Sequence, residues 1–249
     1  MQGVPDDRQV VRRALYDATL LRAHVYLNSS GKLDCRLSVS WYLHPVAVTH
    51  SEISSGTLRM QIERLNIAGL LLVAPSRHAD RRGFFSETYR SDALASAGVR
   101  VQFVQDNHVY SADRGVLRGL HFQIPPRPQG KLVRCTRGAI LDVAVDIRRG
   151  SPTYVHHVDV ELSAENWKQL WVPPGFAHGY LTLEAHCEVI YKVTDYWAPE
   201  CERGIVWNDP SLAIDWRLSA EHMILSDKDK VLPRLADVEP LFIDDKGNS

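Results

Sequence analysis

Hydrophobic and polar residues alternate with a period of two along much of the chain after Met60. The stretch Leu-Asp-Val-Ala-Val-Asp-Ile at residues 141–147 and the stretch His-Val-Asp-Val-Glu-Leu at 157–162 each place apolar side chains on one face of a strand. After Met60, a helical pattern is confined to residues 91–97 and 220–224. Further short apolar runs, separated by Gly, Pro, Asn and Ser, lie at 62–73, 100–105, 115–123, 131–136, 168–173, 179–183 and 187–193. Many short strands without intervening helices predict an all-β sandwich, jelly roll or barrel.

The first 59 residues have a different pattern. Residues 8–22 carry the apolar spacing of a weakly amphipathic helix, and the segment after them has no clear period. We therefore expect a functional domain at residues 60–249. Residues 1–59 would be an N-terminal extension, either helical or poorly ordered, or the product of an upstream start codon.

Composition excludes several classes of protein. Of the 249 residues, 45% are apolar and 24% charged, which is typical of a folded globular protein. The formal net charge of −1 argues against a nucleic-acid-binding protein, which usually carries an excess of basic residues. No apolar stretch approaches the roughly 18–20 residues that span a membrane. Four scattered cysteines and no visible secretory signal favour a reducing cytoplasm.

The densest group of polar residues in the predicted strands contains Arg118, His121, Lys131 and Arg134. Cations and an imidazole that converge in a barrel suit an anionic substrate, or a negative charge that develops during a reaction. The alternative is that the cations are solvated strand ends and His121 is a core histidine. Arg118 and His121 are three positions apart, so a regular strand directs them to opposite faces. They share a cavity only if a β-bulge intervenes, for which Gly119 is the candidate.

Three other positions admit a structural and a chemical interpretation. His178 follows a turn made rigid by two prolines, Tyr191 lies on a strand among core positions, and residues 226–229 resemble an ordinary turn. The stretch His121-Phe-Gln lacks the second histidine and the glutamate of a metal-binding barrel, and the consecutive His156 and His157 face opposite sides of a strand. We therefore expect no catalytic metal. No motif for a nucleotide cofactor is present.

Taken together and in order, eight motifs resemble the dTDP-4-dehydrorhamnose 3,5-epimerase family of sugar-nucleotide epimerases. The resemblance spans residues 60–229. It implies a cupin-like jelly-roll barrel with a few short helices, a homodimer, a dTDP-sugar substrate, and no metal or organic cofactor. The motifs lie at residues 80–87, 105–108, 116–123, 129–134, 142–148, 173–179, 207–210 and 225–229.

The same resemblance implies roles for individual residues. His121 would be the general base, oriented by Asp229, and Tyr191 the proton donor on the opposite face of the sugar. Lys131 would stabilise an enolate formed at the 4-keto oxygen. The substrate-binding positions would be Arg82, Glu87, Gln105, Asn107, Arg118, His178, Trp197, Glu202 and Lys228, with Arg82 and Glu87 reaching the nucleotide of the partner subunit.

The implied reaction converts dTDP-4-dehydro-6-deoxy-D-glucose to dTDP-4-dehydro-L-rhamnose by proton abstraction and re-addition at C3 and C5, in dTDP-L-rhamnose biosynthesis. Trp197, His78 and Val109 depart from the residues usual in the family. They leave open a mono-epimerase that acts at C3 or at C5 alone. A metal-dependent barrel enzyme and a catalytically silent nucleotide-sugar-binding protein are the alternatives from other classes.

Overall fold

The computed structural model describes residues 24–27, 33–36, 60–239 and 242. The chain divides into two compact units, residues 1–56 and 57–249. Of the first unit, the structure describes one antiparallel hairpin, in which β1 (His24–Leu27) pairs with β2 (Leu33–Arg36). The helix expected at residues 8–22 lies outside the described residues, and the domain boundary expected after residue 59 stays a prediction.

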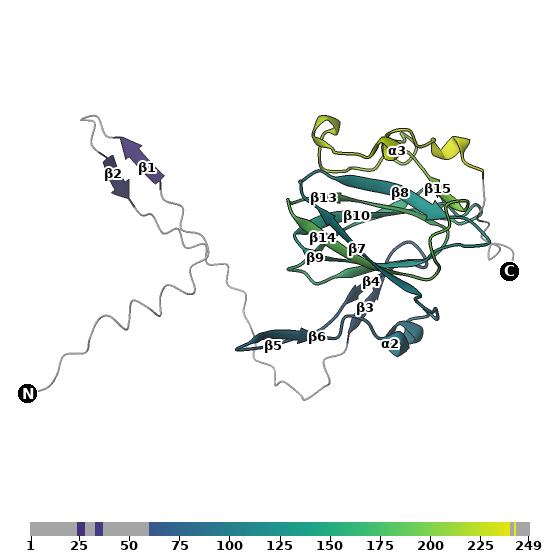
Figure 1. The fold of residues 1–249 in the computed structure, drawn as a ribbon, viewed down its shortest axis with the longest axis horizontal. Helices are drawn as coiled ribbons and strands as arrows, with labels where there is room; N and C mark the ends of the chain where they lie inside the picture. Colours follow the sequence, from purple (N-terminus) through teal and green to yellow (C-terminus); the bar gives the residue numbers. More distant parts are fainter. Residues whose placement is uncertain (1–23, 28–32, 37–59, 240–241, 243–249) are drawn as a thin grey trace, which may run out of the picture. The chain divides into compact units, whose positions relative to one another are not determined.

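The second unit is built from two antiparallel sheets that face each other (Figure 1). In order, the six-stranded sheet contains β3 (Gln61–Arg64), β4 (Leu71–Ala74), β12 (Gln169–Val172), β9 (Lys131–Arg137), β14 (Cys187–Val193) and β7 (Gln105–Ser111). The five-stranded sheet contains β11 (His157–Ser163), β10 (Ala139–Asp146), β13 (Phe176–Thr182), β8 (Leu117–Gln123) and β15 (Glu202–Gly204).

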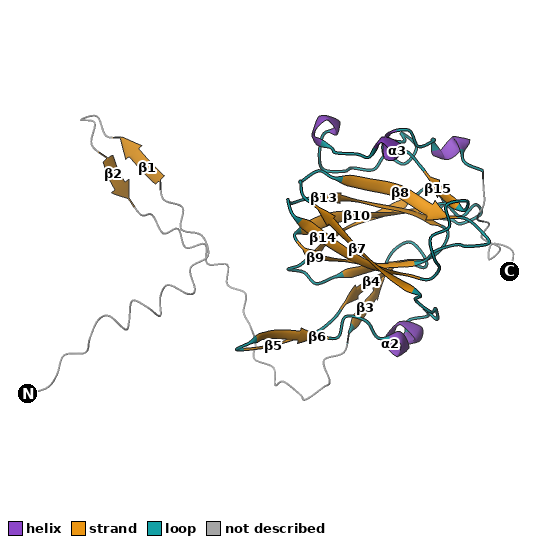
Figure 2. Cartoon of the chain, viewed as in Figure 1, coloured by secondary structure: helices purple, strands orange, loops and turns teal. Residues whose placement is uncertain are grey.

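The remaining elements are short, as Figure 2 shows. They are the hairpin of β5 (Arg77–Asp80) and β6 (Gly83–Ser86), the helices α2 (Ser91–Ser96) and α3 (Asp227–Lys230), and the 3-10 turns η1 (Ala220–His222) and η2 (Leu235–Asp237). The predicted all-β, cupin-like jelly roll is confirmed. None of the helices in the described part of the chain is long and apolar enough to cross a membrane.

Three apolar layers hold the sheets in place. Ile140, Leu170 and Val189 belong to the layer between the sheets. A second layer packs Leu141 of β10 together with residues of the C-terminal segment, and a third includes Leu71 together with Leu94 of α2. Burying one such side chain contributes about 1.5–3 kcal/mol to stability. Because β10 is covered on both faces, its polar residues are buried as well as its apolar ones.

Two local expectations were wrong. The apolar run at 100–105 was expected to form a strand, yet β7 begins only at Gln105 and continues through a polar stretch to Ser111. Full-length pairing with β14 supplies the backbone hydrogen bonds that the local pattern did not predict. Residues 226–229 were expected to form a turn, and residues 227–230 instead form α3. The Ser226 hydroxyl accepts the backbone N–H of Asp229 at 3.1 Å, which caps this helix.

The β-bulge predicted at Gly119 is present. On β8 and β13, Arg118 pairs with Tyr180 and His121 pairs with His178, so two residues of β8 face one residue of β13. Gly119 has φ +127°, a conformation that an L side chain rarely adopts. The bulge therefore offsets the three-residue spacing and lets Arg118 and His121 line the same cavity.

Candidate active site

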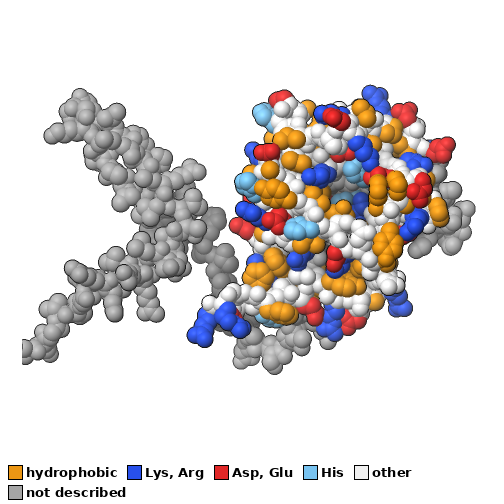
Figure 3. Space-filling view, in the orientation of Figure 1, with side chains coloured by type: hydrophobic (Ala, Val, Ile, Leu, Met, Phe, Trp, Pro, Cys, Tyr) orange, Lys and Arg blue, Asp and Glu red, His pale blue; other side chains and the backbone are white. Residues whose placement is uncertain are grey.

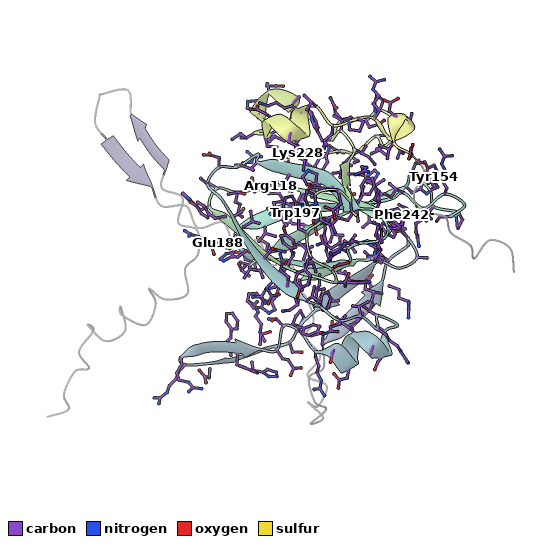
Figure 4. The ribbon with its side chains drawn as sticks, turned by 45° about the vertical axis from the view of Figure 1, so that its right-hand side comes forward. Arg118, Tyr154, Glu188, Trp197, Lys228 and Phe242 are labelled. Carbon is purple, nitrogen blue, oxygen red and sulfur yellow. The ribbon has the colours of Figure 1, made fainter. Side chains whose placement is uncertain are left out.

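A cavity of about 680 Å³ is lined by residues of both sheets, from β7, β8, β9, β13 and β14, and by part of the C-terminal segment at residues 224–229. Figure 3 shows this face of the molecule, where basic and histidine side chains surround a hollow. Arg118 of β8 and Lys228 of α3, both labelled in Figure 4, line this cavity. Among the predicted site residues, the cavity is lined by Arg118, His121, Lys131, His178, Tyr191, Lys228 and Asp229.

The first chemical element of the cavity is an imidazole–carboxylate pair. His121 Nε2 lies 2.7 Å from Asp229 Oδ1, although the two residues are 108 positions apart in sequence. Burial acts to raise the pKa of Asp229, but hydrogen bonding from His121 and the charge of its ring outweigh burial, and the pKa is lowered. Asp229 therefore stays ionised and fixes the orientation of the ring.

Lys131, at the start of β9, brings a positive charge into the same cavity. Its Nζ donates to the backbone carbonyl of His121 at 3.5 Å. Removal from water lowers the pKa of Lys131 from 10.5 to about 8, while the carboxylates of Asp142 and Glu202 act in the opposite direction. The side chain is therefore still mostly the charged ammonium at pH 7, although it is poorly solvated.

A second imidazole–carboxylate pair joins His178, which lines the cavity, to Asp142, which does not. His178 Nε2 is 2.6 Å from Asp142 Oδ1, and both side chains are buried. The sequence analysis assigned no role to Asp142. The available signal was an aspartate at an inward position of an otherwise apolar strand, because a buried carboxylate requires a partner.

Two tyrosines line the cavity wall. Burial raises the pKa of Tyr191 despite the opposing charge of Arg118, so the phenol keeps its proton at neutral pH. Burial raises the pKa of Tyr180 as well, again against the charge of Arg118. The sequence analysis missed Tyr180, whose position on β13 between Leu181 and Gly179 gave no chemical signal.

A smaller cavity of about 220 Å³ shares His121, Lys131 and Tyr191 with the first one. Gln105, Asn107, Trp197 and Glu202 are the other predicted site residues that line it.

Glu202 connects the two cavities through its carboxylate. It accepts the Trp197 indole N–H at 3.2 Å and pairs with Lys228 at 2.7 Å. Burial acts to raise the pKa of Glu202, but these partners outweigh it and the pKa is lowered. The carboxylate is thus ionised and already engaged by two donors.

Arg82 and Glu87 lie outside both cavities. Arg82 sits at the tip of the β5–β6 hairpin, where its side chain is 84% exposed and pairs with Asp80 at 2.6 Å. Glu87 follows β6 and lies 3.8 Å from Arg90. Within one chain, the structure therefore does not bring these two residues to the remaining predicted site residues.

The described residues contain no group of three or more His, Cys, Asp or Glu side chains arranged to hold a metal ion. What they do bring together is an imidazole held by a carboxylate, a protonated phenol and a poorly solvated ammonium around one cavity. A jelly-roll barrel with this set of groups defines an acid–base isomerase that moves protons on a sugar-sized substrate.

Comparison with known proteins identifies the family. The model of the dTDP-4-dehydrorhamnose 3,5-epimerase family matches residues 64–237, and the chain belongs to this family. It is 54% identical over 181 residues to the dTDP-4-dehydrorhamnose 3,5-epimerase of Pseudomonas aeruginosa, which covers 72% of this chain and 98% of the relative.

Solved structures agree with this assignment. A Legionella pneumophila 3,5-epimerase in complex with dTDP-4-keto-L-rhamnose aligns with a TM-score of 0.71 and 44% identity, covering 74% of this chain and 98% of that one. A 3′-monoepimerase from Streptomyces bikiniensis, in complex with dTDP-quinovose, aligns with a TM-score of 0.65 and 36% identity, covering 69% of this chain and 86% of that one.

Proposed function

We propose that this protein is a cofactor-independent epimerase that converts dTDP-4-dehydro-6-deoxy-D-glucose to dTDP-4-dehydro-L-rhamnose. The observation that supports it best is the convergence of His121 with Asp229, of Tyr191 and of Lys131 on one cavity. Family membership supplies the substrate class, and the reaction belongs to dTDP-L-rhamnose biosynthesis.

In the proposed mechanism, His121 removes the proton next to the ketone. Its Nε2 is engaged by Asp229, so Nδ1 is the nitrogen available to accept a proton. The ionised carboxylate stabilises the imidazolium that forms. Proton transfer by a positioned base is typically worth about 10²–10⁴ in rate.

Lys131 carries the second part of the mechanism. A proton next to a ketone is acidic enough to remove only when the enolate that develops is stabilised. A poorly solvated ammonium is well suited to this, because electrostatic attraction is stronger where water is excluded. Hydrogen bonding from Lys131 to the 4-keto oxygen therefore lowers the barrier to each proton abstraction.

Tyr191 completes the inversion. A single base that returns the proton to the same face regenerates the starting sugar, so a separate acid must act from the other face. The raised pKa of Tyr191 keeps its phenol protonated and able to donate. Sequential action at C3 and C5 gives the 3,5-epimerised product.

The second candidate is a mono-epimerase acting at C3 or C5 alone. Trp197 supports this second candidate, because its exposed indole lines the smaller cavity and differs from the residue usual at this position in the family.

We further propose a homodimer in a cytoplasmic setting, with residues 60–249 as the catalytic domain. The exposed β5–β6 hairpin supports the homodimer, since Phe84 and Phe85 are 52% and 70% exposed on it and Arg82 extends from its tip. In a dimer, Arg82 and Glu87 would reach the nucleotide bound by the partner. Removing residues 1–59 should leave activity intact, and an inactive or insoluble product would contradict the domain assignment.

The decisive test is proton NMR of the purified protein with dTDP-4-keto-6-deoxyglucose in D₂O. Deuterium at both C3 and C5 would support the 3,5-epimerase, and deuterium at one carbon would support the mono-epimerase. No exchange at either carbon would contradict the substrate or the assignment of His121. Elemental analysis of the same sample that finds stoichiometric iron, zinc or manganese would favour a metal-dependent barrel enzyme instead.

A further inference from the structure

Tyr180 has a buried hydroxyl that the mechanism above does not use. The residue is 5% exposed and lines the larger cavity, yet among the described residues its hydroxyl has no hydrogen-bond partner. A buried polar group without a partner is destabilising, and a phenylalanine of the same shape would avoid that cost. The hydroxyl therefore calls for a partner that the described part of the chain does not supply.

The neighbours of Tyr180 define what that partner can be. Tyr180 pairs directly with Asp142 on β10 and with Arg118 on β8, so it lies between an anion and a cation on the same sheet. One oxygen of Asp142 is occupied by His178, and Ser111 is already a hydrogen-bond acceptor for Arg118 at 3.4 Å. Ser111 lies close enough to influence the pKa of the Tyr180 phenol, but it forms no hydrogen bond of ordinary length with it.

The other unpartnered atom among the described buried side chains is Oδ2 of Asp142, the residue directly opposite Tyr180. Asp142 lines neither cavity, whereas Tyr180 shares the larger cavity with His121, Lys131 and Tyr191. Of these two groups, the Tyr180 hydroxyl is therefore the one placed beside a bound substrate. The phenol can donate one hydrogen bond, and a hydroxyl oxygen of a sugar can accept it.

We propose that the Tyr180 hydroxyl is a further substrate-contacting group, which donates a hydrogen bond to a hydroxyl oxygen of the bound hexose. This inference rests on the proposed function, because it takes the hexose of a dTDP-sugar as the occupant of the larger cavity. Tyr180 thereby helps to hold the sugar ring between His121 and Tyr191. Its hydroxyl should therefore contribute to the positioning of the hexose and not to the binding of the nucleotide.

Tyr180→Phe tests the inference, because it removes one oxygen and keeps the ring. We expect kcat/KM for dTDP-4-keto-6-deoxyglucose to fall about tenfold, the effect of losing one hydrogen bond to substrate. The affinity for dTDP alone should not change, since dTDP carries no hexose. The melting temperature of the free variant should rise by about 2–4 °C, because an unpartnered buried oxygen has been removed.

Tyr89→Phe is the matched control, since Tyr89 packs against Phe103 outside both cavities. It should leave kcat/KM and dTDP affinity at the wild-type values. A Tyr180→Phe protein with unchanged kcat/KM would overturn the inference, and so would an equal loss of dTDP affinity and kcat/KM.

Wild-type protein in the same D₂O assay distinguishes a failure of the proposed function from a failure of the role of Tyr180. Exchange by wild type together with unchanged kcat/KM in Tyr180→Phe would overturn only the role of Tyr180. No exchange by wild type would overturn the proposed function, and the role of Tyr180 with it.

Discussion

Replacing Lys131 by methionine should make the free protein more stable while abolishing turnover. Burial lowers the pKa of Lys131 from 10.5 to about 8. One pKa unit corresponds to 1.36 kcal/mol, so keeping this ammonium charged inside the folded protein costs roughly 3 kcal/mol at neutral pH. Methionine has a similar length and no charge, and it removes that cost.

The pH dependence of this difference follows from proton linkage. The folded-state pKa lies below the unfolded-state value, so between about pH 8 and 10.5 the unfolded chain binds more protons than the folded one. The cost is therefore fully present below pH 8 and is relieved as the pH rises. The advantage of Lys131→Met should be roughly 3 kcal/mol at pH 7 and about half of that at pH 9.5.

Urea unfolding of both proteins at pH 7 and pH 9.5, at one fixed protomer concentration, measures this difference. Other titrating groups are common to both proteins and cancel in the comparison. Lys192→Met is the control on an exposed face of β14, where the ammonium pairs with Asp106 at 2.8 Å, and it should change stability by less than about 1 kcal/mol. A Lys131→Met protein that is no more stable than wild type at pH 7, or whose advantage does not shrink with pH, would refute the reasoning.

Three further substitutions test the geometry of the site and its support. Gly119→Ala should cost about 1–3 kcal/mol in thermal unfolding and abolish exchange, because φ is +127° and the new Cβ would come within 2.6 Å of Gly179 Cα. Asp146→Ala should cost about 3–5 kcal/mol in urea, since this buried carboxylate holds an arginine and two hydroxyls, while the folded fraction keeps its kcat. Asp229→Asn should slow deuterium exchange by about 10²-fold or more with unchanged dTDP affinity, because an amide cannot stabilise protonated His121. Wild-type exchange rates in Gly119→Ala or Asp229→Asn, or wild-type stability in Asp146→Ala, would contradict the corresponding role.

Local sequence patterns predicted much of the scaffold. Strict alternation predicted the strands β10 and β11, because one face of each must be apolar to pack. The three-residue spacing of Arg118 and His121 predicted a bulge at Gly119, because the side-chain period of a strand is two. These inferences succeed because they depend on neighbours within a few residues along the chain.

Long-range pairings could not be predicted in the same way. His178 and Asp142 are 36 positions apart, and they meet because β10 and β13 are neighbours in the five-stranded sheet. Tyr180 lies between Asp142 and Arg118 because β13 is flanked by both β10 and β8. Sheet order depends on the free energy of the whole fold, which no single segment encodes.

The sequence by itself determined that this is a β-rich protein of the dTDP-4-dehydrorhamnose 3,5-epimerase family, because its motifs are local and their order along the chain is specific. The tertiary structure alone decided which of those residues share a cavity and which, like Arg82, do not. It also decided the electrostatic state of Lys131 and left the Tyr180 hydroxyl without a hydrogen-bond partner among the residues that the structure describes. Burial and desolvation create both properties, and they exist only once distant strands have packed together.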